Sequence, residues 1–580
     1  MPNTSAPQSN VTSVKIGGQA GQGIKSAGLL LAKSATRSGY NIFNYIEYPS
    51  LIRGGHNVMQ INISKDAVMG SRNKTDILIA LNQETIDFHF KELTEGAIVL
   101  FDEGKKLNVS NLPTYVHQVA VPLSQIAQEA GGKELLSNTV ALGATIAILN
   151  GNIETLCTLL SDEFAKKGDV VINANIAAAK KGFEFVKNNF QTCIKDVLVQ
   201  AQNITPKMVV NGDEAVAMGA IAAGLQFASI YPMSPISNIL HTLALHQEKF
   251  GYIYKQPEDE ISAITMAIGA SYAGVRSMTA SSGGGFSLMA EGYGLAGMTE
   301  TPLVIIEGMR GAPATGIPTW NEQGDLRFVL HAHQGDFPRI VLAAGDAIEA
   351  FYLTMEAFSY ADKYQTPVLL LIDKNICDND QSTQFFDVAG YRIDRGKFTK
   401  KQVENYKRFE LSQNGVSTRT IPGSGNFFVA NSDEHDEYGL SSEEIDNRNN
   451  QMNKRMQKLI TCEKEDMQPP MLYGPKEADL TIVSWGSNKG SILEAMAKFP
   501  NVNYIHVTWM NPFPTDSITK ILSTSKNIVD IECNYTGQLA GLIREKTGIE
   551  IKNKWLKFDG RPFYVEELED KISNLLKELK

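Results

Sequence analysis

The sequence predicts an α/β protein made of several open parallel sheets. Short apolar runs that are typical of buried strands, such as residues 11–16, 302–307 and 478–486, alternate along the chain with segments whose apolar residues recur at helical spacing. Helices that connect strands of one parallel sheet form right-handed crossovers. We therefore expect an open parallel sheet in each α/β part of the chain.

Shifts in composition divide the 580 residues into four segments, as the length of the chain allows. Residues 11–195 form a first α/β unit, and residues 205–395, which begin at a Thr-Pro pair, form a second. Residues 396–470 are polar and predict an extended connector with one charged helix near its end. Residues 471–580 return to alternating strands and helices.

The first unit opens with a strand, a glycine turn and a helix. Residues 11–16 predict the strand, residues 17–23 (Gly-Gly-Gln-Ala-Gly-Gln-Gly) the turn, and residues 24–39 the helix. A glycine turn that opens a helix can present free N–H groups to a phosphate. Close packing of the strand on the helix explains the same glycines equally well.

The second unit has a stiff turn at the end of an apolar run. Residues 225–230 predict the end of a strand, and Tyr231-Pro232-Met-Ser234-Pro235 follows. Each proline fixes its φ angle and removes an N–H donor, so we expect Ser234 on a rigid turn and not in a helix. Such turns at strand ends hold ligands in α/β proteins, although a proline-rich turn can also be purely structural.

Three acidic residues, Glu258, Asp259 and Glu260, begin a segment of helical spacing, and we expect all three in its first turn. They suit the positive end of the helix dipole, which could be their whole role. Glu260, however, enters a helix of small residues that pack closely, so its carboxylate needs a partner. Further along, the glycines 283–285 precede an expected apolar helix over 289–298, where the backbone can approach a flat ligand ring.

The loop 308–319 carries one arginine among glycines, prolines and threonines. Arg310 offers a planar fork that suits a carboxylate, and Thr315 and Thr319 offer hydroxyl groups beside it. The loop could hold the carboxylate of an oxoacid. The alternative is an arginine that faces solvent on a surface loop.

Composition limits the classes of function. A net charge of −10 gives no general attraction to nucleic acid or to a membrane surface. The polar first ten residues and the lack of an apolar run of about eighteen residues predict a cytoplasmic protein. The acidic segment 433–437 predicts a solvated turn and not a metal site. Scattered cysteines argue against a disulfide framework and against an iron–sulfur cluster bound wholly by this chain; they are Cys157, Cys193, Cys377, Cys462 and Cys533.

These motifs resemble the α subunit of the 2-oxoacid:ferredoxin oxidoreductases, in the form that has the γ domain fused in front of it. The family pattern Tyr-Pro-Ile-Thr-Pro appears as Tyr-Pro-Met-Ser-Pro, with Ser234 where threonine is usual. The family's arginine and threonine, nine residues apart, fall on Arg310 and Thr319. The resemblance implies that residues 205–395 bind the pyrimidine end of thiamine diphosphate and that residues 471–580 are similar to the C-terminal domain of transketolases.

The same resemblance assigns roles to individual residues. Glu260 matches the glutamate that faces N1′ of the aminopyrimidine, with Tyr231 and Pro232 beside the cofactor. Arg310, Thr319 and Ser234 would hold the substrate and, with Glu260, form the catalytic set. Residues 47–56 and 138–143 resemble the γ domain, which implies coenzyme A near Gly21, Gln22, Gly23 and Arg53. We expect His56 to be packed or hydrogen-bonded and not catalytic.

The sequence also implies a second subunit. Thiamine enzymes hold the diphosphate through Mg²⁺ with a Gly-Asp-Gly motif, and no Gly-Asp-Gly occurs in the sequence. By resemblance, a β subunit supplies that site and a [4Fe–4S] cluster, in an αβ or α2β2 assembly that reduces ferredoxin. The fused γ-α order favours 2-oxoglutarate as the small 2-oxoacid. Pyruvate, a branched-chain oxoacid, or a noncatalytic structural or regulatory subunit remain alternatives.

Overall fold

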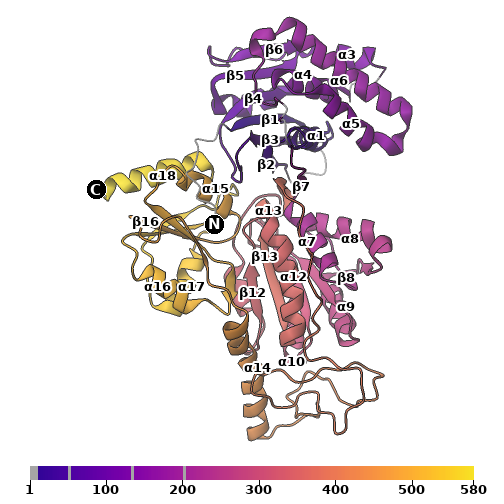
Figure 1. Cartoon of the computed structure of the whole chain (residues 1–580), viewed down its shortest axis with the longest axis vertical. Helices are drawn as coiled ribbons and strands as arrows, with labels where there is room; N and C mark the ends of the chain where they lie inside the picture. Colours follow the sequence, from indigo (N-terminus) through magenta and orange to yellow (C-terminus); the bar gives the residue numbers. More distant parts are fainter. Residues whose placement is uncertain (1–10, 50–53, 132–135, 200, 202–203, 580) are drawn as a thin grey trace.

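The computed structural model describes residues 11–49, 54–131, 136–199, 201 and 204–579. Within them the chain forms three open sheets with helices on their faces, which confirms the α/β class (Figure 1). Each sheet combines the expected parallel pairs with antiparallel ones, so the three open sheets are mixed. In the second and third sheets the antiparallel pairs lie at an edge, formed by β18 and β15, whereas in the first sheet they also run through the middle, where β3 pairs with β1 and β2.

The first sheet has eight strands in the order β6-β5-β4-β1-β3-β2-β14-β7. Parallel pairs join only the four neighbouring strands β6, β5, β4 and β1. Strand β3 is antiparallel to both β1 and β2. The strands are β1 (Thr12–Gln19), β2 (Asn41–Glu47), β3 (His56–Ser64), β4 (Thr75–Ala80), β5 (Leu93–Asp102), β6 (His117–Val121), β7 (Met208–Val210) and β14 (Gln381–Thr383). The helices are α1 (Ile24–Arg37), α2 (Gln83–His89), α3 (Leu123–Glu129), α4 (Ser137–Ile148), α5 (Ile153–Phe164) and α6 (Asp169–Asn189).

The second sheet has seven strands in the order β18-β12-β13-β11-β10-β8-β9, all parallel except β18. Its strands are β8 (Phe227–Ser229), β9 (Ile253–Lys255), β10 (Ser277–Ser281), β11 (Leu303–Met309), β12 (Ile340–Ala343), β13 (Pro367–Asp373) and β18 (Trp509–Asn511). Its helices are α7 (Gly212–Ala222), α8 (Ser237–Phe250), α9 (Glu260–Tyr272), α10 (Gly283–Met298), α11 (Leu326–His331), α12 (Ala347–Tyr364) and α13 (Lys374–Asp378).

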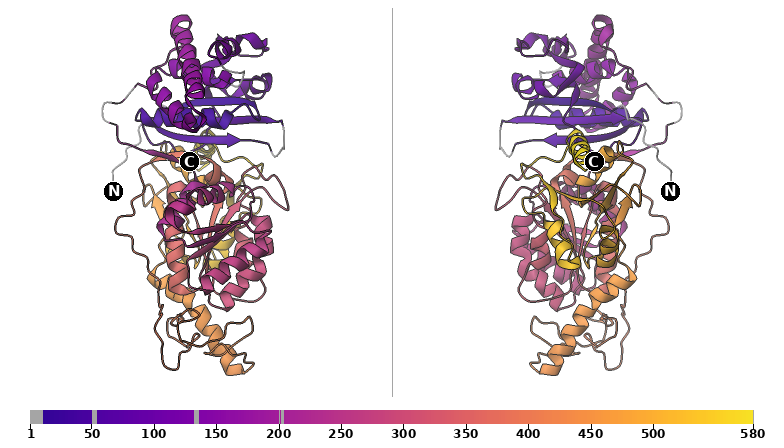
Figure 2. Two further views of the ribbon diagram at one scale, coloured as in Figure 1. Left: turned by 90° about the vertical axis from the view of Figure 1, so that its right-hand side faces the viewer. Right: turned by 90° about the vertical axis from the view of Figure 1, so that its left-hand side faces the viewer.

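The third sheet lies beside the second and below the first (Figures 1 and 2). Its order is β15-β17-β16-β19-β20, with only β15 antiparallel. The strands are β15 (Met471–Tyr473), β16 (Leu480–Ser484), β17 (Val502–His506), β19 (Ile528–Glu532) and β20 (Asn553–Leu556). The helices are α15 (Asn488–Met496), α16 (Thr515–Leu522), α17 (Gln538–Thr547) and α18 (Val565–Glu578).

Short strands and loops connect the three sheets. Strands β7 and β14, from the second segment, extend the first sheet, and β18, from the last segment, pairs with β12. Helices α15 and α18 also contact the first unit, where Arg72 forms ion pairs with Glu494 of α15 and Glu566 of α18. The segment boundaries expected from composition therefore stay a prediction, because strands cross them.

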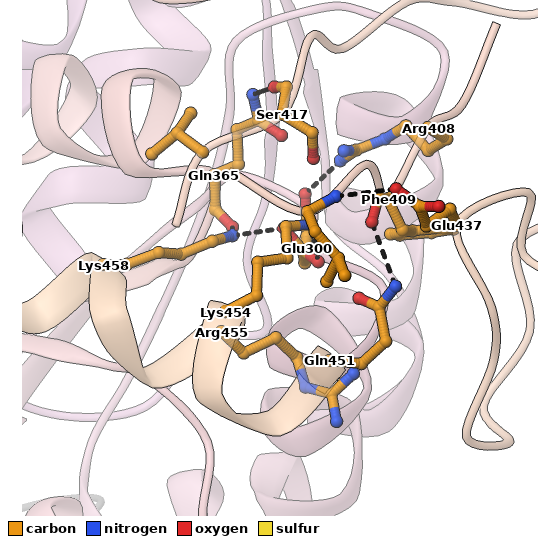
Figure 3. Close-up of polar contacts among 12 residues, drawn as sticks. Glu300, Gln365, Arg408, Phe409, Ser417, Glu437, Gln451, Lys454, Arg455 and Lys458 are labelled. Carbon is orange, nitrogen blue, oxygen red and sulfur yellow. Dashed lines mark hydrogen bonds and ion pairs between the residues drawn. The ribbon is translucent and has the colours of Figure 1, made fainter. Parts of the chain in front are cut away.

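The connector is anchored more firmly than its polar sequence suggests. Residues 396–444, all of them described, contain only isolated bridges, and α14 (Ile445–Glu465) follows (Figure 1). Lys454 and Lys458 of α14 each place Nζ 2.6 Å from the buried carboxylate of Glu300, just after α10. Arg408 donates to the backbone oxygen of Glu300 at 2.7 Å (Figure 3). Cations of the connector thus meet a carboxylate and a helix C-terminus of the core.

The acidic segment 433–437 belongs to this anchor, so its description as a solvated turn was wrong. Glu434 pairs with Arg455 at 2.7 Å and with Arg448. His435 is fully buried against Phe409, with ring centroids 4.1 Å apart. The segment fixes the connector to α14.

The described residues bear on three further expectations. Among them, no helix combines the length and apolar character needed to cross a membrane. The same part of the chain has no group of three or more His, Cys, Asp or Glu side chains placed to hold a metal. All five cysteines lie in described segments, where they are buried and without disulfide partners.

Candidate active site

The predicted site residues of the second unit lie along one edge of its sheet. Strands β9, β8, β10 and β11 are neighbours and run parallel, so their carboxyl ends share one edge. The Tyr231–Ser234 turn follows β8, Glu260 begins the helix after β9, and the Arg310–Thr319 loop follows β11. This edge is where open α/β sheets bind ligands.

Glu260 is the first residue of α9 and is 3% exposed. Its Oε1 atom meets no hydrogen-bond partner in the described part of the chain. Asp259 lies outside the helix as its N-cap and accepts from the Ser262 N–H at 2.7 Å, and Glu258 is also outside. The expectation that all three acids share the first turn was therefore wrong, and Glu260 alone points into the interior.

The glycines 283–285 form the first turn of α10, whereas a turn before the helix was expected. A Cβ on Gly285 would lie 2.4 Å from Glu260 Oε1 and 2.1 Å from Ser281 Oγ. No side chain larger than hydrogen therefore fits beside this carboxylate. The Glu260 carboxylate therefore packs directly against the first turn of α10.

Arg310 connects two of the predicted loops. Its Nη1 donates to the backbone oxygen of Ser234 at 2.7 Å, which leaves the Ser234 hydroxyl for other partners. Ser234 is half-buried on a turn, as expected. Tyr231 is half-buried and Pro232 is exposed, and their expected place beside the cofactor stays a prediction.

The loop after Arg310 folds back on itself. The Gly311 N–H donates to Trp320 O and the Ile317 N–H to Gly311 O, each at 3.0 Å. Thr319 thereby lies beside the base of the loop, 5% exposed, and its Oγ1 has no partner within the described segments. Thr315 is exposed at the tip of the loop, so its expected part in an oxoacid cradle stays a prediction.

Sequence reasoning missed two carboxyl groups near Arg310. Glu307 is fully buried in β11, and Asp325 precedes α11. Burial, followed by the nearby Asp325, raises the pKa of Glu307 well above its usual range. An acidic residue at the end of the apolar run 302–307 was the available signal, because strand interiors rarely hold an acid without a role.

The glycine turn of the first unit lines a separate cavity of about 340 Å³ with Gln19, Gly21, Gln22, Lys105 and Asn138. Strand β1 runs through the first two glycines to Gln19, so the turn is shorter than expected. Gly23 is the N-cap of α1. Arg53 lies outside the described residues.

His56, beside this turn, is hydrogen-bonded as expected. Its Nε2 lies 3.0 Å from Nε2 of His89, and burial lowers the pKa of His56 to about 4.

Family models match the two α/β units. The model described as "Pyruvate flavodoxin/ferredoxin oxidoreductase, thiamine diP-bdg" matches residues 218–454, and the model "Pyruvate ferredoxin/flavodoxin oxidoreductase" matches residues 13–185. Together they cover the glycine turn, Glu260 and Arg310. The fold and these matches define the class as oxidoreductases with a thiamine diphosphate-binding domain.

Individual relatives narrow this class. The 2-oxoacid:ferredoxin oxidoreductase subunit alpha of Saccharolobus solfataricus is 32% identical, over 96% of each chain. The 2-oxoglutarate oxidoreductase subunit KorA of Mycobacterium tuberculosis is 29% identical, over 96% of this chain and 90% of its own. The 2-oxoglutarate:ferredoxin oxidoreductase structure from Magnetococcus marinus, with 2-oxoglutarate, coenzyme A and succinyl-CoA bound, is 31% identical, with a TM-score of 0.91 over 98% of this chain and 100% of that one. The chain belongs to the 2-oxoacid:ferredoxin oxidoreductases and is an alpha subunit of that family.

Proposed function

We propose that this chain, with a β subunit, catalyses the oxidative decarboxylation of 2-oxoglutarate with coenzyme A to succinyl-CoA, CO2 and reduced ferredoxin. The observation that carries the proposal is the buried carboxylate of Glu260, unpartnered among the described residues and held against the glycine turn of α10. Arg310 and Thr319 lie on a loop at the same sheet edge.

Thiamine diphosphate suits this arrangement. The orphaned Oε1 of Glu260 matches a ring nitrogen that needs a carboxylate, and Gly285, which has no Cβ, lets the carboxylate pack against the first turn of α10. The bound cofactor would supply the electron sink that decarboxylation of a 2-oxoacid requires. Glu260 would hold the pyrimidine end, with Tyr231 and Pro232 nearby, while Mg²⁺, the diphosphate site and a [4Fe–4S] cluster would belong to the β subunit.

The remaining residues would bind the oxoacid. Arg310 can pair with its carboxylate through the planar guanidinium, and the hydroxyl groups of Thr319 and Ser234 can donate to its oxygens. Coenzyme A would approach from the γ-like unit, with Gly21, Gln22, Gly23 and Arg53 as candidate contacts. We expect an αβ or α2β2 assembly in the cytoplasm.

Two relatives support 2-oxoglutarate as the substrate, because their names or contents include it. Pyruvate or a branched-chain oxoacid is the alternative within this enzyme class. A noncatalytic subunit would have no need for a glutamate buried without a partner, since such a group destabilises the fold.

Gly285→Ala is expected to reduce the rate of oxoacid oxidation by at least about tenfold, because the added Cβ displaces the Glu260 carboxylate. Correct positioning of a reacting group contributes this much or more to the rate. Gly284→Ala is the matched control: its Cβ would have Ala314 O as its nearest atom, at 3.9 Å. Both variants are assayed as complexes with the β subunit. Equal activity of the two variants would contradict the assigned role of Glu260.

Arg310→Ala is expected to lower kcat/KM for the oxoacid by roughly 10- to 100-fold, the value of one charge-assisted contact. Arg310→Lys should recover only part of this loss, because an ammonium group lacks the planar fork. Steady-state kinetics with the oxoacid varied, and coenzyme A then varied separately, check both statements. An unchanged kcat/KM for the oxoacid would remove Arg310 from the site.

A further inference from the structure

Arg561, which follows the last strand of the third sheet, lies against the loop of the candidate site. Its guanidinium carbon is 3.5 Å from the centroid of the Trp320 ring. Trp320 follows Thr319 in the chain, and its backbone oxygen accepts from the Gly311 N–H at 3.0 Å, next to Arg310. Arg561 is therefore placed at the base of the same loop that carries Arg310 and Thr319.

The backbone just before Arg561 packs tightly on this loop. The Asn321 N–H donates to Gly560 O at 3.0 Å. A Cβ on Gly560 would lie 2.8 Å from Ile317 Cδ1 and 2.9 Å from Trp320 Cβ, and the φ angle of 82° at this position also favours glycine. Because nothing larger than glycine fits between the two segments, the third sheet holds Arg561 directly beside the candidate site.

The positive charge of Arg561 is not neutralised by a carboxylate within the described ranges of the chain. Its Nη1 donates to the backbone oxygen of Asp559 at 3.1 Å. Stacking on Trp320 takes up one face of the guanidinium, whereas the N–H donors lie in its plane and are not directed at the ring. The side chain is half-buried, so the remaining donors can reach a ligand. A planar cation of this kind suits a carboxylate.

We propose that Arg561 binds the distal carboxylate of a dicarboxylic 2-oxoacid and thereby determines the specificity of the site. The two carboxylates of 2-oxoglutarate stand at opposite ends of its carbon chain, and Arg310 is assigned to the one beside the keto group. Arg561 supplies a second cation at the base of the same loop. Pyruvate has no second carboxylate and would leave the charge of Arg561 unpaired. This inference rests on the proposed function.

Arg561→Ala, assayed in the complex with the β subunit, should lower kcat/KM for 2-oxoglutarate by about 10- to 100-fold, mainly through KM, as expected for one charge-assisted contact. The value for pyruvate should stay within about twofold of wild type. Arg561→Lys should recover part of the loss, because it keeps the charge without the planar fork. An equal loss with both oxoacids, or no loss with either, would overturn the proposal.

Arg544→Ala is the matched control in the same part of the chain. Arg544 is exposed on α17 and pairs with Glu550 at 3.2 Å, so its removal should change neither value. The KM for coenzyme A should also be unchanged in Arg561→Ala. A rise confined to coenzyme A would assign Arg561 to a phosphate of that substrate and would overturn the proposal.

Binding of two non-oxidisable analogues gives a readout that does not depend on turnover. Succinyl phosphonate keeps the distal carboxylate, and acetyl phosphonate lacks it. Calorimetric titration of the complex should show the Kd of succinyl phosphonate raised about 10- to 100-fold in Arg561→Ala, with that of acetyl phosphonate unchanged. Equal effects on the two analogues, or no preference of the wild type for succinyl phosphonate, would overturn the proposal. If the wild-type complex oxidised no 2-oxoacid, the proposed function would fail, while these titrations would still decide what Arg561 binds.

Discussion

Glu260→Ala is expected to abolish oxoacid oxidation, with a loss of at least about a hundredfold, while the chain still assembles with the β subunit. A positioned proton-transfer group contributes about 10²- to 10⁴-fold, and Glu260 is the only acid of its Glu-Asp-Glu run that is buried. The variant removes a carboxylate that makes no hydrogen bond through Oε1 to any described residue, so the fold loses little. Turnover is measured by anaerobic viologen reduction and assembly by co-purification.

Glu258→Ala is the matched control, because Glu258 is exposed and precedes the helix. It should leave both activity and assembly unchanged. Normal activity of Glu260→Ala would show that the carboxylate has no part in the reaction. Loss of assembly in Glu260→Ala would instead make it a structural residue.

Glu300→Gln is expected to destabilise the protein by about 3–5 kcal/mol, the usual cost of leaving buried charges uncompensated. Glu300 is fully buried between Lys454 and Lys458, which are themselves buried (Figure 3). Burial would raise the pKa of Glu300, but Lys454, Lys458 and Arg408 hold it well below its usual range. Urea unfolding measures the loss, and limited proteolysis should cut first in the connector, residues 396–470.

The loss of unfolding free energy in Glu300→Gln, relative to wild type, should depend on pH. Burial lowers the pKa of Lys458 to about 7 and that of Lys454 to about 8, although Glu300 opposes the decrease. Without Glu300 the folded variant binds fewer lysine protons than folded wild type, so the difference in stability shrinks as pH rises from about 6 to 9. A deficit that grows with pH would contradict this ion cluster.

Asp162→Asn is the control for an exposed ion pair. Arg37 and Asp162 are 3.2 Å apart and both largely exposed, so the change should cost no more than about 1 kcal/mol. An equal loss in Asp162→Asn and Glu300→Gln would show that burial does not set the size of the effect.

Much of the fold was predictable because many strands are continuous apolar runs. The run 366–373 is β13 and the run 528–532 is β19, within one residue at each end. Strand β3 was not predicted because it carries polar side chains that the structure buries, including Gln60 and Asn62. The alternation of apolar and polar residues along the sequence therefore did not predict the antiparallel part of the first sheet.

The residue types of the candidate site were predicted from the sequence. The neighbouring residues that hold them in place were not. Local propensity favours a turn at glycines 283–285, whereas in the structure they begin α10, where an added Cβ would meet Asp325 or Glu260; sequence spacing does not contain this tertiary environment. The sequence predicted only an extended connector over residues 396–470, because polar residues predominate there, and it gave no sign that cations of this segment are buried. Their carboxylate partner Glu300 lies over 100 positions away in the sequence.

The most direct measurement is anaerobic viologen reduction by the chain co-expressed with a β subunit, with 2-oxoglutarate, pyruvate and 2-oxoisovalerate compared in the presence and absence of coenzyme A. We expect reduction that depends on coenzyme A and is fastest with 2-oxoglutarate. No reduction with any oxoacid, from a complex shown to contain thiamine diphosphate and an intact cluster, would contradict the proposed function.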